Sequence, residues 1–231
     1  MDSLNEELDV YLFYEISHLI HLDDLYNLSN CDVNLNLIIN DVTFIKNVIN
    51  NSIDNYIKIY VVNKQWKYAL RLSAGYGYIS LCKYFIELGA KDFNEALCDA
   101  AREGHLKLFK YLVSLGATNF NSALNNAACG GQLEICKYIV SLGVTYFDHA
   151  LECAAEYKFL DICEYLVSIG DISTIGFNKA LCSAALSGSL EICKYLVPLG
   201  NFDATNFNKA YKYARYGGNK DVQSYLQKCM N

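Results

Sequence analysis

Several features that mark enzymes and metal sites are scarce or missing in this sequence. Its ten cysteines include no C-x-x-C pair, which argues against a structural zinc site. Its 14 glycines are spread along the chain with never more than two in a row, so no glycine-rich loop is present to hold a phosphate group. None of its four histidines (His18, His21, His105 and His149) stands beside a recurring nucleophile or a pair of carboxylates. We therefore expect no enzyme, no cofactor and no metal.

Long apolar runs are also missing. No stretch of 18 apolar residues and no signal-like or arginine-rich leader occurs, so we expect a soluble cytoplasmic monomer with no membrane partner. Lysine and arginine number 19 against 25 acidic residues, which gives a net charge of −6, and the lysines are scattered. Duplex nucleic acid is bound through a basic stripe that neutralises its phosphates, so no nucleic-acid partner is expected.

What the sequence does contain is a repeated segment that begins, in most copies, with phenylalanine. Phe93–Asn119 reads FNEALCDAAREGHLKLFKYLVSLGATN, and the copy from Phe120 reads FNSALNNAACGGQLEICKYIVSLGVTY. A fixed period of 27 to 30 residues is typical of a solenoid, in which each unit buries its apolar face against its neighbours. Within a repeat domain of residues 64–231, the expected units are 66–92, 93–119, 120–146, 147–176, 177–206 and 207–231.

Columns shared by these units predict two helices in each of them and an all-α fold. An alanine-rich stretch such as Glu95–Glu103 gives a first helix, and a single glycine ends it, as a residue with positive φ would. A second helix follows, with apolar residues at helical spacing, and another glycine closes it. The residue after the leading phenylalanine is expected to cap the first helix. These expected caps are Asn94, Asn121, Asp148, Asn178 and Asn208.

A few positions carry their own predictions. Lys158 occupies the turn position that glycine fills in the other units, so it is expected at positive φ. Pro198 removes a backbone donor near the end of a second helix and predicts a local bend. Gln223 and Gln227 replace a cysteine and a valine of the preceding unit, which predicts a polar C-terminal cap. One column of the second helix is expected to fill a small apolar core position, and it consists of Cys82, Phe109, Cys136, Cys163 and Cys193.

These columns resemble the ankyrin repeat, whose unit reads T-P-L-H-x-A-A, then G-H, then L-E-I-V and G-A. Ala100-Ala101 keeps the double alanine, and Gly104-His105 keeps the G-H pair. Leu190–Cys193 keeps L-E-I-V with cysteine for valine, and Gly116-Ala117 keeps G-A. The resemblance covers residues 66–231, and it implies an ankyrin-type helix–turn–helix solenoid that binds a protein partner.

The units are shorter than the usual ankyrin period of about 33 residues. The missing residues fall where the family forms a β-hairpin finger, so we expect shortened or absent fingers and little or no strand. The longer connections Asp171–Gly176 and Asn201–Asn206 are the best candidates for a fuller finger. Such clipped units, rich in asparagine and tyrosine, are similar to those of ankyrin proteins in giant DNA viruses of amoebae. That similarity implies host–virus interaction and the host cytoplasm.

The resemblance also implies a place for the partner, because ankyrin proteins bind with their fingers and with the exposed end of the first helix. In this sequence that end holds residues that differ from unit to unit while their neighbours do not. Partner binding and drift of an unconstrained surface both explain such variation. The expected partner-binding face consists of Tyr76, Arg102, Glu103, Cys129, Glu156, Tyr157, Leu186, Ser187 and Tyr216.

Residues 1–63 do not fit the repeat. They carry ten acidic and two basic residues, a net charge of −8, and no glycine or proline. Their apolar spacing resembles the start of an F-box, the helical module that docks on Skp1 in a ubiquitin ligase, although Asp9 stands where the F-box has proline. The alternative is a helical cap over the apolar side of the first repeat. The F-box-like positions are Leu8, Leu12, Ile16, Ile20, Asp24 and Leu25.

Two functions follow from these resemblances. The first is an adaptor that binds a target through its repeats and recruits it to a Skp1-containing ubiquitin ligase through residues 1–63. The alternative is a plain ankyrin interaction module, with no link to ubiquitin, that binds and blocks a host or cellular partner.

Overall fold

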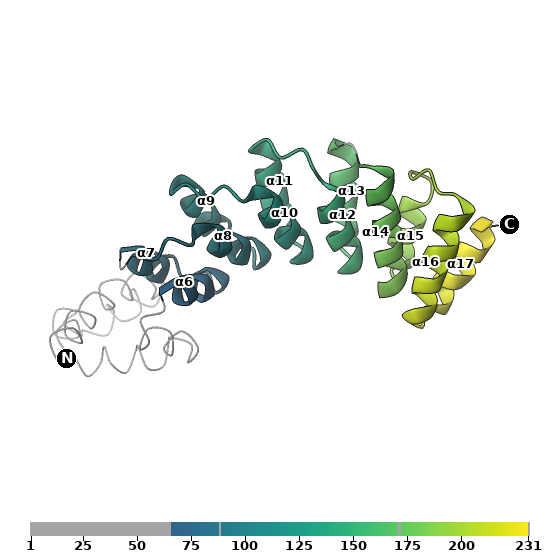
Figure 1. Ribbon diagram of the computed structural model, residues 1–231, viewed down its shortest axis with the longest axis horizontal. Helices are drawn as coiled ribbons and strands as arrows, with labels where there is room; N and C mark the ends of the chain where they lie inside the picture. Colours follow the sequence, from purple (N-terminus) through teal and green to yellow (C-terminus); the bar gives the residue numbers. More distant parts are fainter. Residues whose placement is uncertain (1–65, 88, 171, 231) are drawn as a thin grey trace, which may run out of the picture. The chain divides into compact units, whose positions relative to one another are not determined.

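The computed structural model describes residues 66–87, 89–170 and 172–230, and these residues contain α-helices and turns but no strand. The F-box-like positions predicted within residues 1–63 lie outside this part of the chain. The chain divides into two compact units, residues 1–96 and 97–231. Figure 1 shows the described helices in chain order.

The first unit contains one described helix pair, α6 (Trp66–Gly75) and α7 (Ile79–Glu87), which pack against each other. The ring of Trp66 stacks on that of Phe85, with the centroids 6.1 Å apart. Lys67 forms an ion pair with Asp92, with 3.2 Å between Nζ and Oδ1. Ala69 and Ala74 of α6 are fully buried, so an alanine-lined core begins at the first repeat, as the columns predict.

The second unit repeats the same helix pair along the chain. The helices from α10 to α16 with even numbers pack side by side in one layer, and α11, α13, α15 and α17 form a second layer against them (Figure 1). The predicted all-α helix–turn–helix solenoid is thus confirmed for the described residues. After α8 (Phe93–Arg102), which begins in the first unit, the helices are α9 (Leu106–Ser114), α10 (Phe120–Cys129), α11 (Leu133–Ser141), α12 (Asp148–Glu156), α13 (Leu160–Ile169), α14 (Thr174–Ser187), α15 (Leu190–Leu196), α16 (Ala204–Tyr216) and α17 (Lys220–Met230).

Alanine allows the first helices to pack close together, because its small methyl side chain leaves room for neighbouring backbones to approach. Every alanine of two columns is fully buried, and the second helices cover this layer with larger side chains such as Phe109 and Leu112. The predicted core column of cysteines is also confirmed, since each of its members is fully buried. The alanines of the second unit that are completely buried are Ala100, Ala101, Ala123, Ala127, Ala128, Ala150, Ala154, Ala155, Ala180, Ala184, Ala185, Ala210 and Ala214.

The turn inside each helix pair has the predicted left-handed residue. Gly104, Gly131, Gly188 and Gly218 have φ between 73° and 88°, and Lys158 takes the same conformation with φ 69°. In the second unit the same hydrogen bond closes each turn, from the amide after the left-handed residue to the carbonyl of the alanine five residues before that amide, as from Asn219 to Ala214 over 2.8 Å. The uniform turn gives every first helix the same end.

The longer connections correct one expectation. The described residues of Asp171–Gly176 and Asn201–Asn206 do not form fuller fingers, because Thr174–Gly176 and Ala204–Asn206 belong to additional N-terminal turns of α14 and α16. These helices have 14 and 13 residues, whereas α10 has ten and α12 has nine. The added residues extend helices that already pack on a neighbour, which keeps their backbone groups hydrogen-bonded.

The expected caps are also corrected. The α10 cap is Asn119, whose side chain accepts a hydrogen bond from the amide of Ser122, and not Asn121. Asn178 and Asn208 lie inside α14 and α16, whose caps are residues of the connections, and Asp148 is the first residue of α12. The leading phenylalanine is therefore the N-cap of α12, the first residue of α8 and α10, and an interior residue of α14 and α16. The caps of α14 and α16 are Ser173 and Asp203.

Pro198 ends a helix and does not bend one. α15 stops at Leu196 after seven residues, and the amides of Leu199 and Gly200 both bond to the Leu196 carbonyl in a tightened turn. The expected bend is therefore replaced by an early end, since proline supplies no amide to continue the ladder. Within the described residues, no helix has both the length and the apolar character needed to cross a membrane.

Candidate partner-binding surface

The predicted partner-binding residues lie at the C-terminal ends of the first helices or directly after them. Arg102, Cys129, Glu156 and Tyr216 are each the last residue of their helix, and Tyr157 directly follows α12. Leu186 and Ser187 end α14, and in the first unit Tyr76 follows α6. Because each of these helices ends in the same turn, the turn itself fixes where these side chains begin.

Several of these side chains are open to solvent. Tyr216 is 78 % exposed, Tyr157 is 47 % exposed and Leu186 is 42 % exposed, and all three are large and apolar in part. Arg102, Glu103 and Glu156 are exposed and charged, whereas Cys129 and Ser187 are partly buried. Exposed tyrosine and arginine beside one another are typical of the residues that dominate protein interfaces.

Hydrogen bonds between neighbouring repeats fix the spacing of these helix ends. The Asn219 amide group donates to the carbonyls of Ala185 and Leu186 over 2.9 and 2.8 Å, and the Ser187 hydroxyl donates to the Ala155 carbonyl over 3.3 Å. A Cβ on Gly130 would collide with the Arg102 carbonyl oxygen, so only glycine allows this approach of α10 to α8. The spacing of the helix ends is thus fixed by side-chain bonds from Ser187 and Asn219 and by the close approach at Gly130.

Cys129 is the one thiol among the predicted surface residues, and two neighbouring residues lower its pKa. The Cys153 thiol of α12 donates a hydrogen bond to Cys129, which lowers the pKa of Cys129, and the positive charge of Arg102 adds to this lowering. The same contact and burial raise the pKa of Cys153. The Sγ atom of Cys153 also lies 4.0 Å from Nδ1 of His149. The pKa of Cys129 therefore lies below that of an isolated thiol.

Sequence reasoning did not find the residues that support this surface. Asn219 and Cys153 belong to columns whose members differ in every unit, so no shared pattern marks them. Asn219 directly follows the left-handed glycine, and that position could have indicated a contact with the preceding helix end. Nothing in the sequence alone indicates that Cys153 faces Cys129, because the contact joins two helices.

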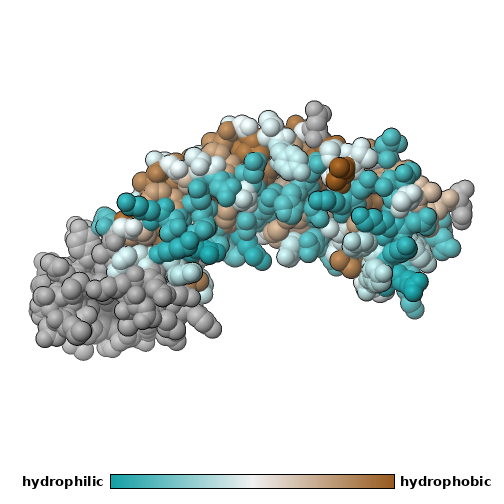
Figure 2. Space-filling model, in the orientation of Figure 1, coloured by the Kyte–Doolittle hydropathy of each residue, from teal (hydrophilic) through white to brown (hydrophobic). Residues whose placement is uncertain are grey.

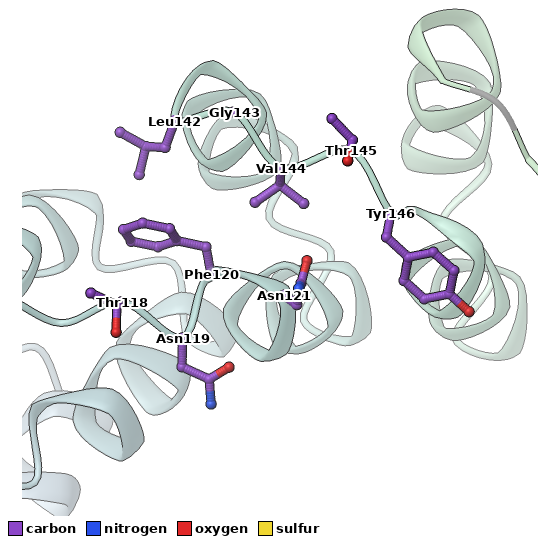
Figure 3. A pocket seen from close by; sticks show the side chains of 9 residues that line it. All are labelled: Thr118, Asn119, Phe120, Asn121, Leu142, Gly143, Val144, Thr145 and Tyr146. Atoms are coloured by element: carbon purple, nitrogen blue, oxygen red, sulfur yellow. The ribbon is translucent and has the colours of Figure 1, made fainter.

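A shallow hollow of about 270 Å³ lies elsewhere in the second unit, beside the start of α10. Figure 3 shows that Phe120 and Val144 face it from α10 and from the connection after α11. Its lining carries no carboxylate, histidine, lysine or cysteine, so it offers no acid–base or metal chemistry. The lining residues are Thr118, Asn119, Phe120, Asn121, Leu142, Gly143, Val144, Thr145 and Tyr146.

No group of three or more histidine, cysteine, aspartate or glutamate residues in the described part of the chain could hold a metal ion.

Comparison with known proteins agrees with this geometry. No curated protein matches the chain. A protein-family model described as ankyrin repeats (3 copies) matches residues 97–176, which run from α8 into the start of α14. The matched residues are similar to ankyrin repeats, and the same helix pair continues beyond them through α16 and α17.

Proposed function

We propose that the chain is a protein-interaction module whose partner contacts the C-terminal ends of the first helices. The observation that carries this proposal is the contrast between framework and surface. Buried alanines and left-handed turns recur in nearly every unit, while the exposed residues beside each turn differ in charge, size and aromatic character. Ankyrin repeats support protein–protein interaction, and residues 97–176 match them.

The rigidity of the surface favours binding to a preformed partner site. The helix ends are joined by side-chain hydrogen bonds such as that of Asn219, so few of their degrees of freedom remain to be lost on association. Tyr157, Leu186 and Tyr216 supply apolar area around which Arg102 and Glu156 supply polar contacts. A partner that covers several units would combine these contacts.

Photo-crosslinking tests the location of the partner. A photoreactive phenylalanine analogue replaces Tyr157 or Tyr216, and in matched control variants it replaces Glu164 of α13 or Lys194 of α15, which are exposed on second helices. We expect the Tyr157 and Tyr216 variants to form adducts of the same mass in extract of the natural host cell. Adducts from the two control positions alone would overturn the proposal.

An adaptor role is the second candidate, and the spacing of Leu8, Leu12, Ile16 and Ile20 favours it. The proposal is that these residues recruit Skp1, so that a partner bound to the repeats becomes a ubiquitination target. The full chain would be mixed with purified Skp1 and followed by size-exclusion chromatography. We expect co-elution that Leu12→Asp with Ile16→Asp abolishes and that Tyr157→Ala leaves unchanged. Elution of the unaltered chain apart from Skp1 would leave the plain interaction module.

A further inference from the structure

The exposed side of α16 differs from the same side of the other first helices. Arg215 occupies a column that in units two to five of the repeat holds a fully buried alanine, as at Ala155 and Ala185. Lys212 likewise occupies the position of Cys182, which is buried. Both replacements are exposed in α16. Neutral polar residues would be enough to keep an exposed helix face in contact with water. The presence of two cations at these positions therefore needs a further explanation.

Three cations form one exposed stripe on this helix. Lys209, Lys212 and Arg215 follow each other at intervals of three residues, and each is exposed. The stripe is about 9 Å long at 1.5 Å per residue. Tyr216 stands at its end, and its ring meets that of Tyr213 edge to face with the centroids 6.4 Å apart. Figure 2 shows hydrophilic residues at this end of the second unit, where α16 and α17 lie.

No acidic side chain of the described residues forms an ion pair with these cations. α16 and its neighbour α14 contain no aspartate or glutamate, and α17 contains only Asp221. Lys179 of α14 shows the contrast, because its Nζ lies 3.9 Å from a carboxylate oxygen of Glu152. Like charges on successive turns of a helix repel one another, so the uncompensated stripe is a cost that a bound anion would remove.

We propose that the stripe of Lys209, Lys212 and Arg215, with Tyr216 at its end, binds a short acidic segment of a partner protein. This inference rests on the proposed function and names the chemistry of the partner. An extended segment advances about 3.3 Å per residue, so the stripe matches about three to four residues rich in aspartate or glutamate. Arg215 adds paired donors suited to a carboxylate, and Tyr216 adds an apolar contact.

A short acidic segment fits this surface better than a nucleic acid does. A nucleic acid is bound through many phosphate contacts along an extended basic surface, whereas this stripe holds three cations over about 9 Å. The whole chain carries a net charge of −6, which also disfavours a long polyanion.

The test measures binding of a fluorescein-labelled peptide of alternating glutamate and tyrosine to the full chain at low ionic strength. The main variant carries Lys209→Gln, Lys212→Gln and Arg215→Gln. A matched control carries Lys107→Gln, Lys194→Gln and Lys228→Gln, which removes the same charge from exposed positions on other helices. We expect about tenfold weaker binding in the main variant and little change in the control.

Three further measurements separate loss of charge from loss of folding and an acidic peptide from other ligands. A variant with Lys209→Arg, Lys212→Arg and Arg215→Lys keeps the charge and should keep the binding, and circular dichroism reports whether each variant folds. A peptide with glutamine in place of glutamate should not bind. Equal weakening in the main and control variants would overturn the proposal, and so would an oligonucleotide that binds the stripe more tightly than the acidic peptide.

The same inference can fail while the proposed function stands. Crosslinked adducts at Tyr157 and Tyr216 together with no binding of the acidic peptide would overturn only the acidic partner. Loss of all adducts from the helix-end surface would overturn the proposed function itself, whatever the peptide does.

Discussion

The Asp148 carboxylate accepts a hydrogen bond from the backbone amide of Ser173 over 2.9 Å, and this contact joins the start of α12 to the cap of α14. The Ser173 hydroxyl donates a second bond to Asp148 and accepts one from the amide of Gly176. Asp148 is buried, and a Cβ on Gly176 would collide with its carboxylate. A single side chain thus organises the start of a helix in the next unit.

Asp148→Ala should lower the free energy of unfolding by about 2 kcal/mol, because hydrogen bonds to a charged group are lost and the Ser173 cap loses its support. Asp148→Asn keeps one acceptor and should cost less. Urea unfolding followed by circular dichroism gives both values. Asn121→Ala is the matched control, since Asn121 fills the same column and is exposed. Equal losses for Asp148→Ala and Asn121→Ala would contradict a specific role for this contact.

Lys158→Gly should stabilise the protein by about 1 kcal/mol, because Lys158 has φ 69° and a side chain is disfavoured in the left-handed region. The reverse change at Gly218 is the control. Gly218 has φ 73°, and a Cβ added to it would have no atom within 4 Å, so Gly218→Lys should destabilise by a similar amount without a steric clash. The urea midpoints of the two variants should therefore move in opposite directions. An unchanged midpoint for Lys158→Gly would show that Lys158 is not strained in its left-handed conformation.

The turns could be predicted from the sequence because their requirement is local. A left-handed residue must follow each first helix, glycine meets that requirement at little cost, and its recurrence at a fixed spacing exposes Lys158 as the exception. The buried alanine and cysteine columns were predictable for a similar reason, since each unit packs on a copy of itself. Repetition within one chain supplied the comparison.

The helix starts could not be read from the same columns. Ser173 and Asp203 are good cap residues, but they stand in connections that only two units possess. Whether the added residues extend a helix or form a finger depends on packing against the neighbouring unit. The repeat columns predict a cap directly after the leading phenylalanine, whereas α14 and α16 begin three residues before that phenylalanine.

The position of the candidate residues at the helix ends follows from the sequence, but the side-chain contacts that support these helix ends do not. The residues beside each turn lie where the repeat places them, because the turn is the same in every unit. Their connections, such as Asn219 to the carbonyl of Leu186 and Cys153 to Cys129, join different units through side chains that no column shares. That these residues bind a partner stays a proposal for the crosslinking test.

The core cysteines should make stability fall at alkaline pH. Burial raises the pKa of Cys163 from 9.0 to about 12, and burial has the same effect on Cys82, Cys136 and Cys193. Between pH 9 and 12 the unfolded thiols lose their protons while the folded thiols keep them. The resulting stability is complete below pH 9 and is lost as pH rises towards 12, by about 1.4 kcal/mol per pH unit for each cysteine.

Cys163→Val tests this dependence. The variant lacks one titrating thiol, so its unfolding free energy should decline less steeply above pH 9, by about 1.4 kcal/mol per pH unit relative to the unaltered chain. Urea unfolding at several pH values gives the difference. A constant difference between the two proteins from neutral to alkaline pH would show that Cys163 does not carry this linkage.

Cys129 should react with a thiol reagent faster than the other partly buried cysteines of the repeats, Cys98 and Cys229. Its pKa is lowered by the hydrogen bond from Cys153, so more of its reactive thiolate is present near neutral pH. Peptide mass spectrometry after brief iodoacetamide treatment reports each site separately. Cys153→Ala removes the donor and should slow the reaction at Cys129. Unchanged labelling in that variant would show that the two thiols are not coupled.

The polar residues of the sixth unit should keep the repeats from associating end to end. Gln223 donates a hydrogen bond to the Ala214 carbonyl over 3.4 Å, Gln227 is exposed, and Arg215 covers a position that is alanine in the inner units. Gln223→Cys, Gln227→Val and Arg215→Ala together give this unit the residues of the fifth one and uncover an apolar patch. Light scattering should then show a mass that rises with concentration, whereas the unaltered chain stays monomeric. The control variant carries Lys107→Ala, Lys194→Ala and Lys228→Ala, three exposed positions on other helices, and should not associate. If the triple variant stays monomeric at every concentration, these side chains do not form the barrier to stacking.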